Sequence, residues 1–99
     1  MKQVQAEKID EIGYTINYLG YTISLPKHLI YKYIAIDKID NLYYVMLYEF
    51  IPTIIEDKTM WNNSSYLGKF NDCRIVLKLP ITTNIDWKDS LTKINYENN

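Results

Sequence analysis

Residues 12–26, with the sequence IGYTINYLGYTISLP, decide most of what the sequence predicts about the fold. Apolar side chains alternate with small or polar ones through residues 12–18 and again through residues 21–25. A period of two is typical of a strand that buries one face. We therefore predict two antiparallel strands joined by a three-residue loop, in which Gly20 takes a left-handed conformation beside a bulge.

Pro26 should end the second strand, and it fits the first turn of a helix, where its missing N–H breaks no hydrogen bond. Four apolar residues after it have the spacing of one helix face. They favour a short helix over residues 26–33 and are Leu29, Ile30, Tyr33 and Ile34. The β-branched and aromatic residues of 30–36 also fit a strand, and this alternative stays open.

A central strand is predicted over residues 42–51, LYYVMLYEFI, in which Glu49 is the one charged residue. A long apolar run that is rich in Tyr and β-branched side chains is typical of a strand with both faces buried. Residues 37–41 are then the connection that precedes this strand.

The segment of residues 51–69 is long for a connection in so small a domain, which indicates a functional loop or an element of its own. Large apolar side chains lie next to polar ones in it, a composition typical of contact surfaces. We take four of them as candidate partner-binding residues: Met60, Trp61, Tyr66 and Leu67. Packing of the same side chains onto the core is the alternative.

The C-terminal tail, residues 81–99, carries Trp87, Leu91 and Ile94 at the spacing of one helix face. We predict a short amphipathic helix over residues 86–96. Its apolar stripe either docks on the core of its own chain or binds a partner, so these three residues join the candidate partner-binding set.

Length and charge exclude several classes of protein. The 99 residues fit one domain, with a strand-rich core at 11–50 and 70–79. Eleven Lys and Arg residues nearly balance twelve Asp and Glu residues, which argues against strong nonspecific nucleic-acid binding. No apolar run is long enough for a transmembrane helix, and the first residues lack the apolar core of a signal peptide. We therefore expect an intracellular, cytoplasmic protein.

Catalytic and metal-binding patterns are missing from the sequence. His28 is the one histidine and Cys73 the one cysteine, and no nucleophile motif surrounds either. Three isolated glycines cannot form a phosphate-binding loop, and one cysteine excludes a Cys-rich zinc site. We predict that the protein is not an enzyme and has neither a cofactor nor a metal.

The order of these elements resembles the SpoVT/AbrB-type domain, which transcription factors of the AbrB kind and antitoxins of the MazE kind share. The matching stretch is residues 19–29, LGYTISLPKHL: a Leu-Gly turn, a strand, Pro-Lys and the start of a helix. Residues 71–78, NDCRIVLK, are similar to the last strand of the family, which follows an acidic turn. Tyr21 stands where the family usually has an Arg that contacts DNA.

The resemblance implies an α+β fold that is mostly β. This would be a small antiparallel sheet or a swapped-hairpin barrel with one or two short helices, in which two chains exchange hairpins as an intertwined homodimer. It also implies a non-enzymatic transcription regulator that binds duplex DNA. The candidate nucleic-acid contacts are Asn17, Tyr21, Lys27, His28 and Lys32.

A second hypothesis comes from the composition. Ile, Lys, Tyr and Asn have A/T-rich codons and make up 44 of the 99 residues, which resembles small proteins of archaeal viruses and AT-rich phages. The alternative function is therefore a protein-interaction or accessory module of a virus or mobile element, antitoxin-like or inhibitor-like, without DNA binding. Its partner would be a host or viral protein, and its location the host cell.

Overall fold

The structure is a computed structural model, and it describes residues 1–11, 13–26, 31–39, 41–54, 61–62, 73–80 and 86–96. Strands dominate this part of the chain, and its only helical residues form the 3₁₀ turn η1 (Trp87–Asp89). In chain order the strands are β1 (Lys2–Asp10), β2 (Gly13–Tyr18), β3 (Tyr21–Pro26), β4 (Tyr33–Ile39), β5 (Leu42–Tyr48), β6 (Thr53–Ile54), β7 (Trp61–Asn62), β8 (Cys73–Lys78) and β9 (Thr92–Tyr96).

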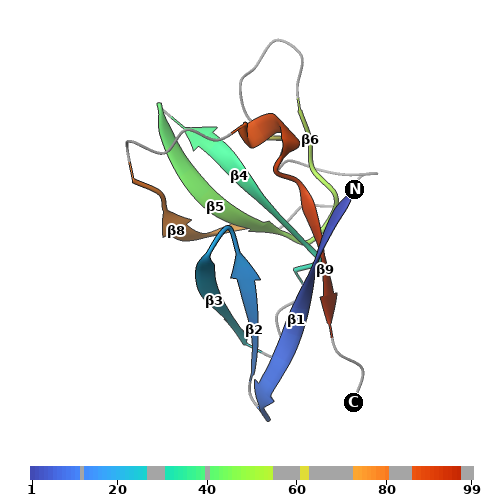
Figure 1. The fold of residues 1–99 in the computed structure, drawn as a ribbon. Helices are drawn as coiled ribbons and strands as arrows, with labels where there is room; N and C mark the ends of the chain where they lie inside the picture. Colours follow the sequence, from blue (N-terminus) through green and yellow to red (C-terminus); the bar gives the residue numbers. More distant parts are fainter. Residues whose placement is uncertain are drawn as a thin grey trace.

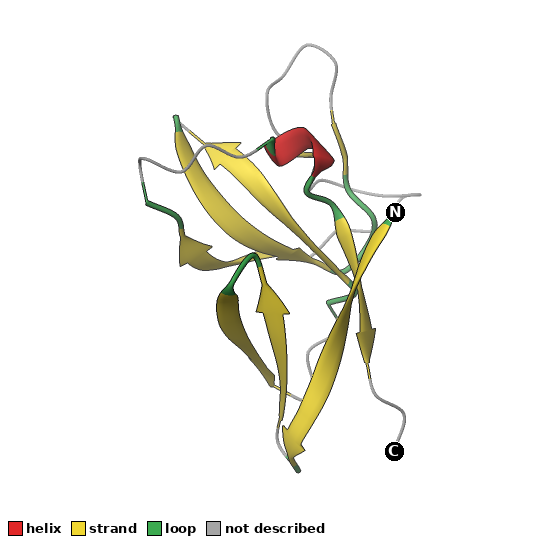
Figure 2. Ribbon diagram, viewed as in Figure 1, coloured by secondary structure: helices red, strands yellow, loops and turns green. Residues whose placement is uncertain are grey.

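Seven strands form one sheet in the order β3-β2-β1-β9-β4-β5-β8, which curls into a nearly closed barrel (Figure 1). β6 and β7 pair with each other in a separate two-stranded sheet. Figure 2 shows how completely strands make up the described chain. Strand β9 is out of chain order: it lies between β1 and β4, parallel to β1 and antiparallel to β4.

The predicted α+β fold class is wrong, because the described chain is almost entirely β and one chain supplies the whole barrel-like sheet. The helix predicted over residues 86–96 is a single 3₁₀ turn followed by β9. Apolar residues at helical spacing cannot form a helix when pairing partners on both sides favour a strand, and the β-branched and aromatic residues of β9 suit a sheet.

The helix predicted over residues 26–33 is not found at either end. Pro26 is the last residue of β3 and pairs with Gly13, and Tyr33 is the first residue of β4; residues 27–30 lie outside the described residues. The open alternative, a strand in the 30–36 stretch, is therefore correct for its second half. Ile34, Ala35 and Ile36 are all fully buried, which a strand with both faces covered explains and a helix with one exposed face does not.

The predicted hairpin is confirmed, but its turn is shorter than predicted. Tyr18 pairs directly with Tyr21, so Leu19 and Gly20 alone form the turn. Both have positive φ, 53° and 82°, as the central residues of a type I′ turn do. The right-handed twist of the two strands favours this turn over a longer loop, even though leucine is poorly suited to it.

The strand predicted at 42–51 is found as β5, which ends at Tyr48 and pairs with β4 on one side and β8 on the other. Ile39 pairs with Leu42, and Asn41 has a φ of 66°, a conformation that Asn tolerates. β4 thus includes residues 37–39, which the sequence assigned to a connection. Strand pairing with β5 extends β4 to the turn itself.

The core lies inside the curled sheet and takes side chains from nearly every strand. Tyr14 and Tyr96 meet edge to face at 4.9 Å, which links β2 to β9 across β1. The buried side chains of the core include Ala6, Ile16, Ile23 and Leu25 from the first three strands, and Ile34, Ile36, Val45, Leu47 and Ile94 from the others. The core therefore joins both halves of the sheet.

A substitution at Leu19 tests the turn. Leu19 is 53% exposed, so its side chain contributes little packing, whereas its left-handed backbone costs about 1 kcal/mol. We expect Leu19→Asn to raise the free energy of unfolding by roughly that amount, measured by urea denaturation. As a control, Gly20→Ala should lower it, because an added Cβ meets nothing within 4 Å but the φ of 82° is strained. An unchanged stability for both variants would contradict a type I′ turn.

Candidate functional site: the free edge of β3

The sheet has two terminal strands, β3 and β8, and they bound the open seam of the barrel (Figure 1). A terminal strand has one row of backbone N–H and C=O groups without a neighbouring strand. Such an edge is a template for pairing with another chain unless the protein protects it. The two edges differ in how far they are protected.

Strand β8 carries three features that discourage pairing. Its register with β5 shifts beside Val45 and Met46, which marks a bulge, and bulges twist an edge out of line. Arg74 and Lys78 are exposed on it, and within the described ranges neither side chain has an ion pair or a hydrogen bond. Charged side chains, lysine above all, protect natural sheet edges, although Ile75 remains 52% exposed here.

Strand β3 has none of this protection along Tyr21–Leu25. It carries no Asp, Glu, Lys, Arg or His, and its register with β2 is regular from Tyr21 to Pro26. Tyr21 is 37% exposed, and Thr22 and Ser24 are exposed as well. The β3 edge is thus regular, uncharged and accessible.

The two-residue turn determines which backbone groups of β3 face outward. In such a hairpin the pair that flanks the turn, Tyr18 and Tyr21, exchanges backbone hydrogen bonds, and every second pair does so after it. Tyr21, Ile23 and Leu25 therefore direct their N–H and C=O groups to β2. Those of Thr22 and Ser24 point away from the sheet.

Pro26 fits this alternation. It follows Ser24 by two residues and pairs with Gly13, so it occupies an outward position. Its missing N–H would have faced away from β2, and no ladder hydrogen bond is lost, as is usual for proline in edge strands. Pro26 also ends the row of outward donors, so that the β3 edge offers the N–H groups of Thr22 and Ser24.

The structure places the predicted nucleic-acid residues apart. Asn17 pairs with Thr22, one position away from the Tyr18–Tyr21 pair, so Asn17 and Tyr21 lie on opposite faces of the hairpin. Lys32 is exposed just before β4, and β1 and β9 separate β4 from β2, which is roughly 14 Å along the sheet. The remaining two, Lys27 and His28, lie outside the described residues.

The predicted partner-binding residues of the C-terminal tail lie in or against the core. Trp87 and Ile94 are 7% and 3% exposed, and Leu91 is half-buried against the same cluster. Trp61 belongs to β7. The other three, Met60, Tyr66 and Leu67, lie outside the described residues.

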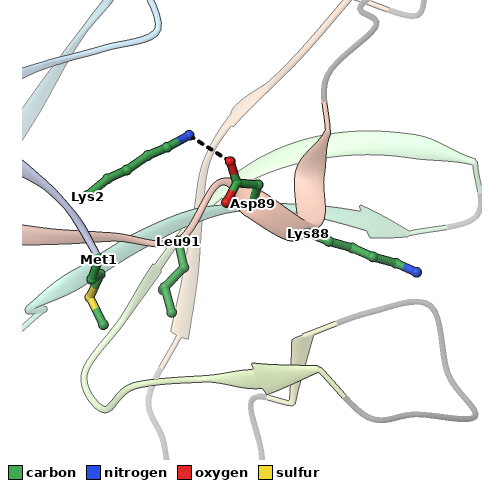
Figure 3. A pocket seen from close by; sticks show the side chains of 5 residues that line it. All are labelled: Met1, Lys2, Lys88, Asp89 and Leu91. Atoms are coloured by element: carbon green, nitrogen blue, oxygen red, sulfur yellow. Dashed lines mark ion pairs between the residues drawn. The ribbon is translucent and has the colours of Figure 1, made fainter.

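A shallow hollow of about 500 Å³ lies beside η1, lined by Met1, Lys2, Lys88, Asp89 and Leu91 (Figure 3). The Lys2 ammonium lies 3.3 Å from the Asp89 carboxylate, and both side chains are mostly exposed. Figure 3 shows the Lys88 side chain extending away from this ion pair. With an exposed ion pair and no buried polar group, the hollow lacks the convergent donors of a ligand site.

A buried polar junction at Ser90 holds η1 against the barrel. The Ser90 Oγ accepts a hydrogen bond from the Ile36 N–H at 2.8 Å and donates one to the Trp87 carbonyl at 2.6 Å. The Ser90 carbonyl accepts hydrogen bonds from the hydroxyls of Tyr18 and Thr92, each at 2.8 Å. All of these groups are engaged in the fold, and the junction is structural.

Three tyrosine hydroxyls are held neutral by their surroundings. Burial raises the pKa of Tyr18 and of Tyr48, and for Tyr48 the nearby Asp37 adds to the effect. Burial also raises the pKa of Tyr96 to about 12, and its hydroxyl donates a hydrogen bond to the Tyr31 carbonyl at 2.5 Å. A phenol with a raised pKa stays protonated at neutral pH and cannot accept a proton there, so these pKa shifts do not indicate a general base.

The Tyr48 hydroxyl is fully buried and finds no hydrogen-bond partner among the residues that the structure describes. Burial of a hydroxyl without a partner costs about 1–3 kcal/mol. The described residues also contain no group of His, Cys, Asp and Glu side chains suited to a metal ion. Within the same ranges, no helix is long and apolar enough to cross a membrane.

The β3 edge is not among the sites predicted from the sequence, although the sequence carries a signal for it. A strand without charges that ends in proline is a pattern for an edge strand rather than a central one. From the sequence, Pro26 is predicted only to end a strand and to start a helix. The position of β3 at the edge follows from the order of the strands in the sheet, and this order cannot be predicted from local sequence.

Comparison of the chain with protein-family models, curated proteins and solved structures finds no match in any of the three.

Two buried tyrosines give a matched test of the core. Tyr48→Phe removes a hydroxyl that has no partner in the described structure, and we expect the free energy of unfolding to rise by about 1 kcal/mol. Tyr18→Phe removes the donor to the Ser90 carbonyl, and we expect a fall of about 1 kcal/mol. Denaturant unfolding monitored by circular dichroism measures both. A loss of stability in Tyr48→Phe as large as in Tyr18→Phe would contradict this assignment.

Alkaline pH should destabilise the fold through Tyr96. Its pKa is about 12 in the folded chain, against about 10 in the unfolded chain, so the unfolded state releases its proton first. The contribution is complete below pH 10 and is lost as pH rises toward 12. We expect the stability of Tyr96→Phe to fall less steeply over that range in urea titrations. Parallel curves for the two proteins would refute this.

Proposed function

We propose that this chain is a non-enzymatic protein-interaction module that pairs the β3 edge with an extended segment of another polypeptide. The observation that carries the proposal is the contrast between the two edges of the sheet. β8 is bulged and charged, whereas β3 is regular and uncharged and directs the N–H and C=O groups of Thr22 and Ser24 outward.

Strand addition gains affinity from main-chain hydrogen bonds and specificity from alternate side chains. On β3 the outward backbone groups of Thr22 and Ser24 supply the main-chain hydrogen bonds. Tyr21, which is 37% exposed, supplies an apolar contact at the end of the strand next to the turn. Leu19 in the turn itself is more exposed still and extends this apolar contact.

The hypothesis of a DNA-binding regulator remains a prediction. It rests on exposed Lys32, Asn17 and Tyr21, which do not share one face, and on a net charge of −1. An accessory role in a virus or mobile element, with a host or viral protein as partner, also remains a prediction. We place the module inside the cell, because a chain with one cysteine, Cys73, cannot form an internal disulfide.

Arrayed extended peptides of random sequence provide the probe for the interaction. We expect the full chain to bind a subset of them, and bound peptide should slow hydrogen exchange at the amides of Thr22 and Ser24. The amide of Ile23 is the internal control, because it already bonds to β2.

Ser24→Pro is the decisive variant. It removes an outward N–H and leaves the hydrogen bonds between β2 and β3 intact, as Pro26 does naturally. We expect peptide affinity to fall at least about tenfold, whereas Ser24→Ala, which keeps the N–H, should bind as the parent does. Binding of no peptide by the parent, or equal binding by Ser24→Pro, would overturn the proposal. A salt-sensitive shift of a DNA duplex would favour the regulator instead.

A further inference from the structure

We infer that the strand that pairs with the β3 edge is β3 of a second copy of this chain, related to the first by a two-fold axis at Ile23. The inference rests on the proposed function and names its partner. Three properties of β3 carry it: the positions of its outward backbone groups, its lack of charge and the sequence of its two faces.

The outward groups of β3 are self-complementary. In an antiparallel pair centred on Ile23, Thr22 lies opposite the partner's Ser24, and Ser24 lies opposite the partner's Thr22. These are the residues whose N–H and C=O groups point outward. Each of the two pairs can therefore exchange both of its backbone hydrogen bonds, and Pro26 lies beyond them, where its missing donor is not needed.

Charge favours pairing of two β3 strands over pairing of two β8 strands. Residues Tyr21–Pro26 contain no acidic or basic side chain, so two copies of β3 meet without repulsion. Two copies of β8 centred on Val76 would set Arg74 opposite the partner's Lys78. Like charges directly opposite each other destabilise a strand pair.

Side chains also match across the axis. On the exposed face, the hydroxyl of Thr22 meets that of the partner's Ser24, a favourable cross-strand pair. On the core face, Tyr21 lies beside the partner's Leu25, and Ile23 beside the partner's Ile23. Tyr21, which is 37% exposed, then loses contact with water, and the burial of this apolar surface favours the pairing.

The assembly removes the unprotected edge from both copies. Its sheet continues from one copy into the other and ends on both sides in β8, the edge that is already bulged and charged. One strand per copy is a small interface, so we expect dissociation in the micromolar range or weaker. The measurement must therefore extend to hundreds of micromolar chain.

Sedimentation equilibrium of the full chain over that range tests the inference. We expect a monomer–dimer equilibrium whose dissociation constant rises at least about tenfold in Ser24→Pro and stays unchanged in Ser24→Ala. Circular dichroism melting confirms that each variant folds. Hydrogen exchange should show slower exchange at Thr22 and Ser24 as the concentration of the parent chain increases.

Charge pairs test the position of the axis. Thr22→Glu with Ser24→Glu sets glutamates opposite each other across the axis and should abolish the dimer, whereas Thr22→Lys with Ser24→Glu sets opposite charges together and should restore it. A parent chain that stays monomeric, a dimer that Ser24→Pro leaves intact, or equal loss in both charge variants would each overturn the inference. Peptide binding at low chain concentration would then still support the proposed function, and its absence would remove both.

Discussion

The pairing of β9 with both β1 and β4 is the interaction on which the rest of this structure depends. β9 runs parallel to β1 from Lys2 opposite Thr92 to Ala6 opposite Tyr96, and it bonds to β4 on its other side. Without it, the β1–β3 meander and the β4–β5–β8 group would be two small sheets, each with an uncovered apolar face. Ser90 fixes the start of β9, because its hydroxyl bonds to Ile36 of β4 and to the turn at Trp87.

The central position of β9 determines which strands form the two edges of the sheet. The last strand lies in the middle of the sheet, so the terminal positions go to strands from the interior of the sequence. These strands differ in charge and regularity, and that difference gives the molecule one protected edge and one suited to pairing. The proposed protein-interaction role depends on this difference between the edges. The hydroxyls of Tyr18 and Tyr96 are instead hydrogen-bonded within the fold.

The hairpin of residues 13–26 shows how far local sequence can predict a fold. The alternation of apolar and polar residues predicts its two strands, and Gly20 predicts its turn. The turn is one residue shorter than predicted, because the twist of the strands favours a type I′ turn even with leucine at position 19. Residues 86–96 show the opposite case. The spacing of Trp87, Leu91 and Ile94 fits a helix face, yet η1 and β9 form because β1 and β4 offer backbone partners on both sides.

The sequence by itself determined the strand-forming residues of β2, β3 and β5 and the absence of motifs for catalysis and metal binding. Both follow from side-chain chemistry within a short window. Only the tertiary structure decided that residues 92–96 form a strand, that Ile34, Ala35 and Ile36 are buried on both faces, and that β3 is an edge. These depend on partners distant in sequence, because a backbone hydrogen bond in a sheet is made between strands and is not encoded in either strand alone.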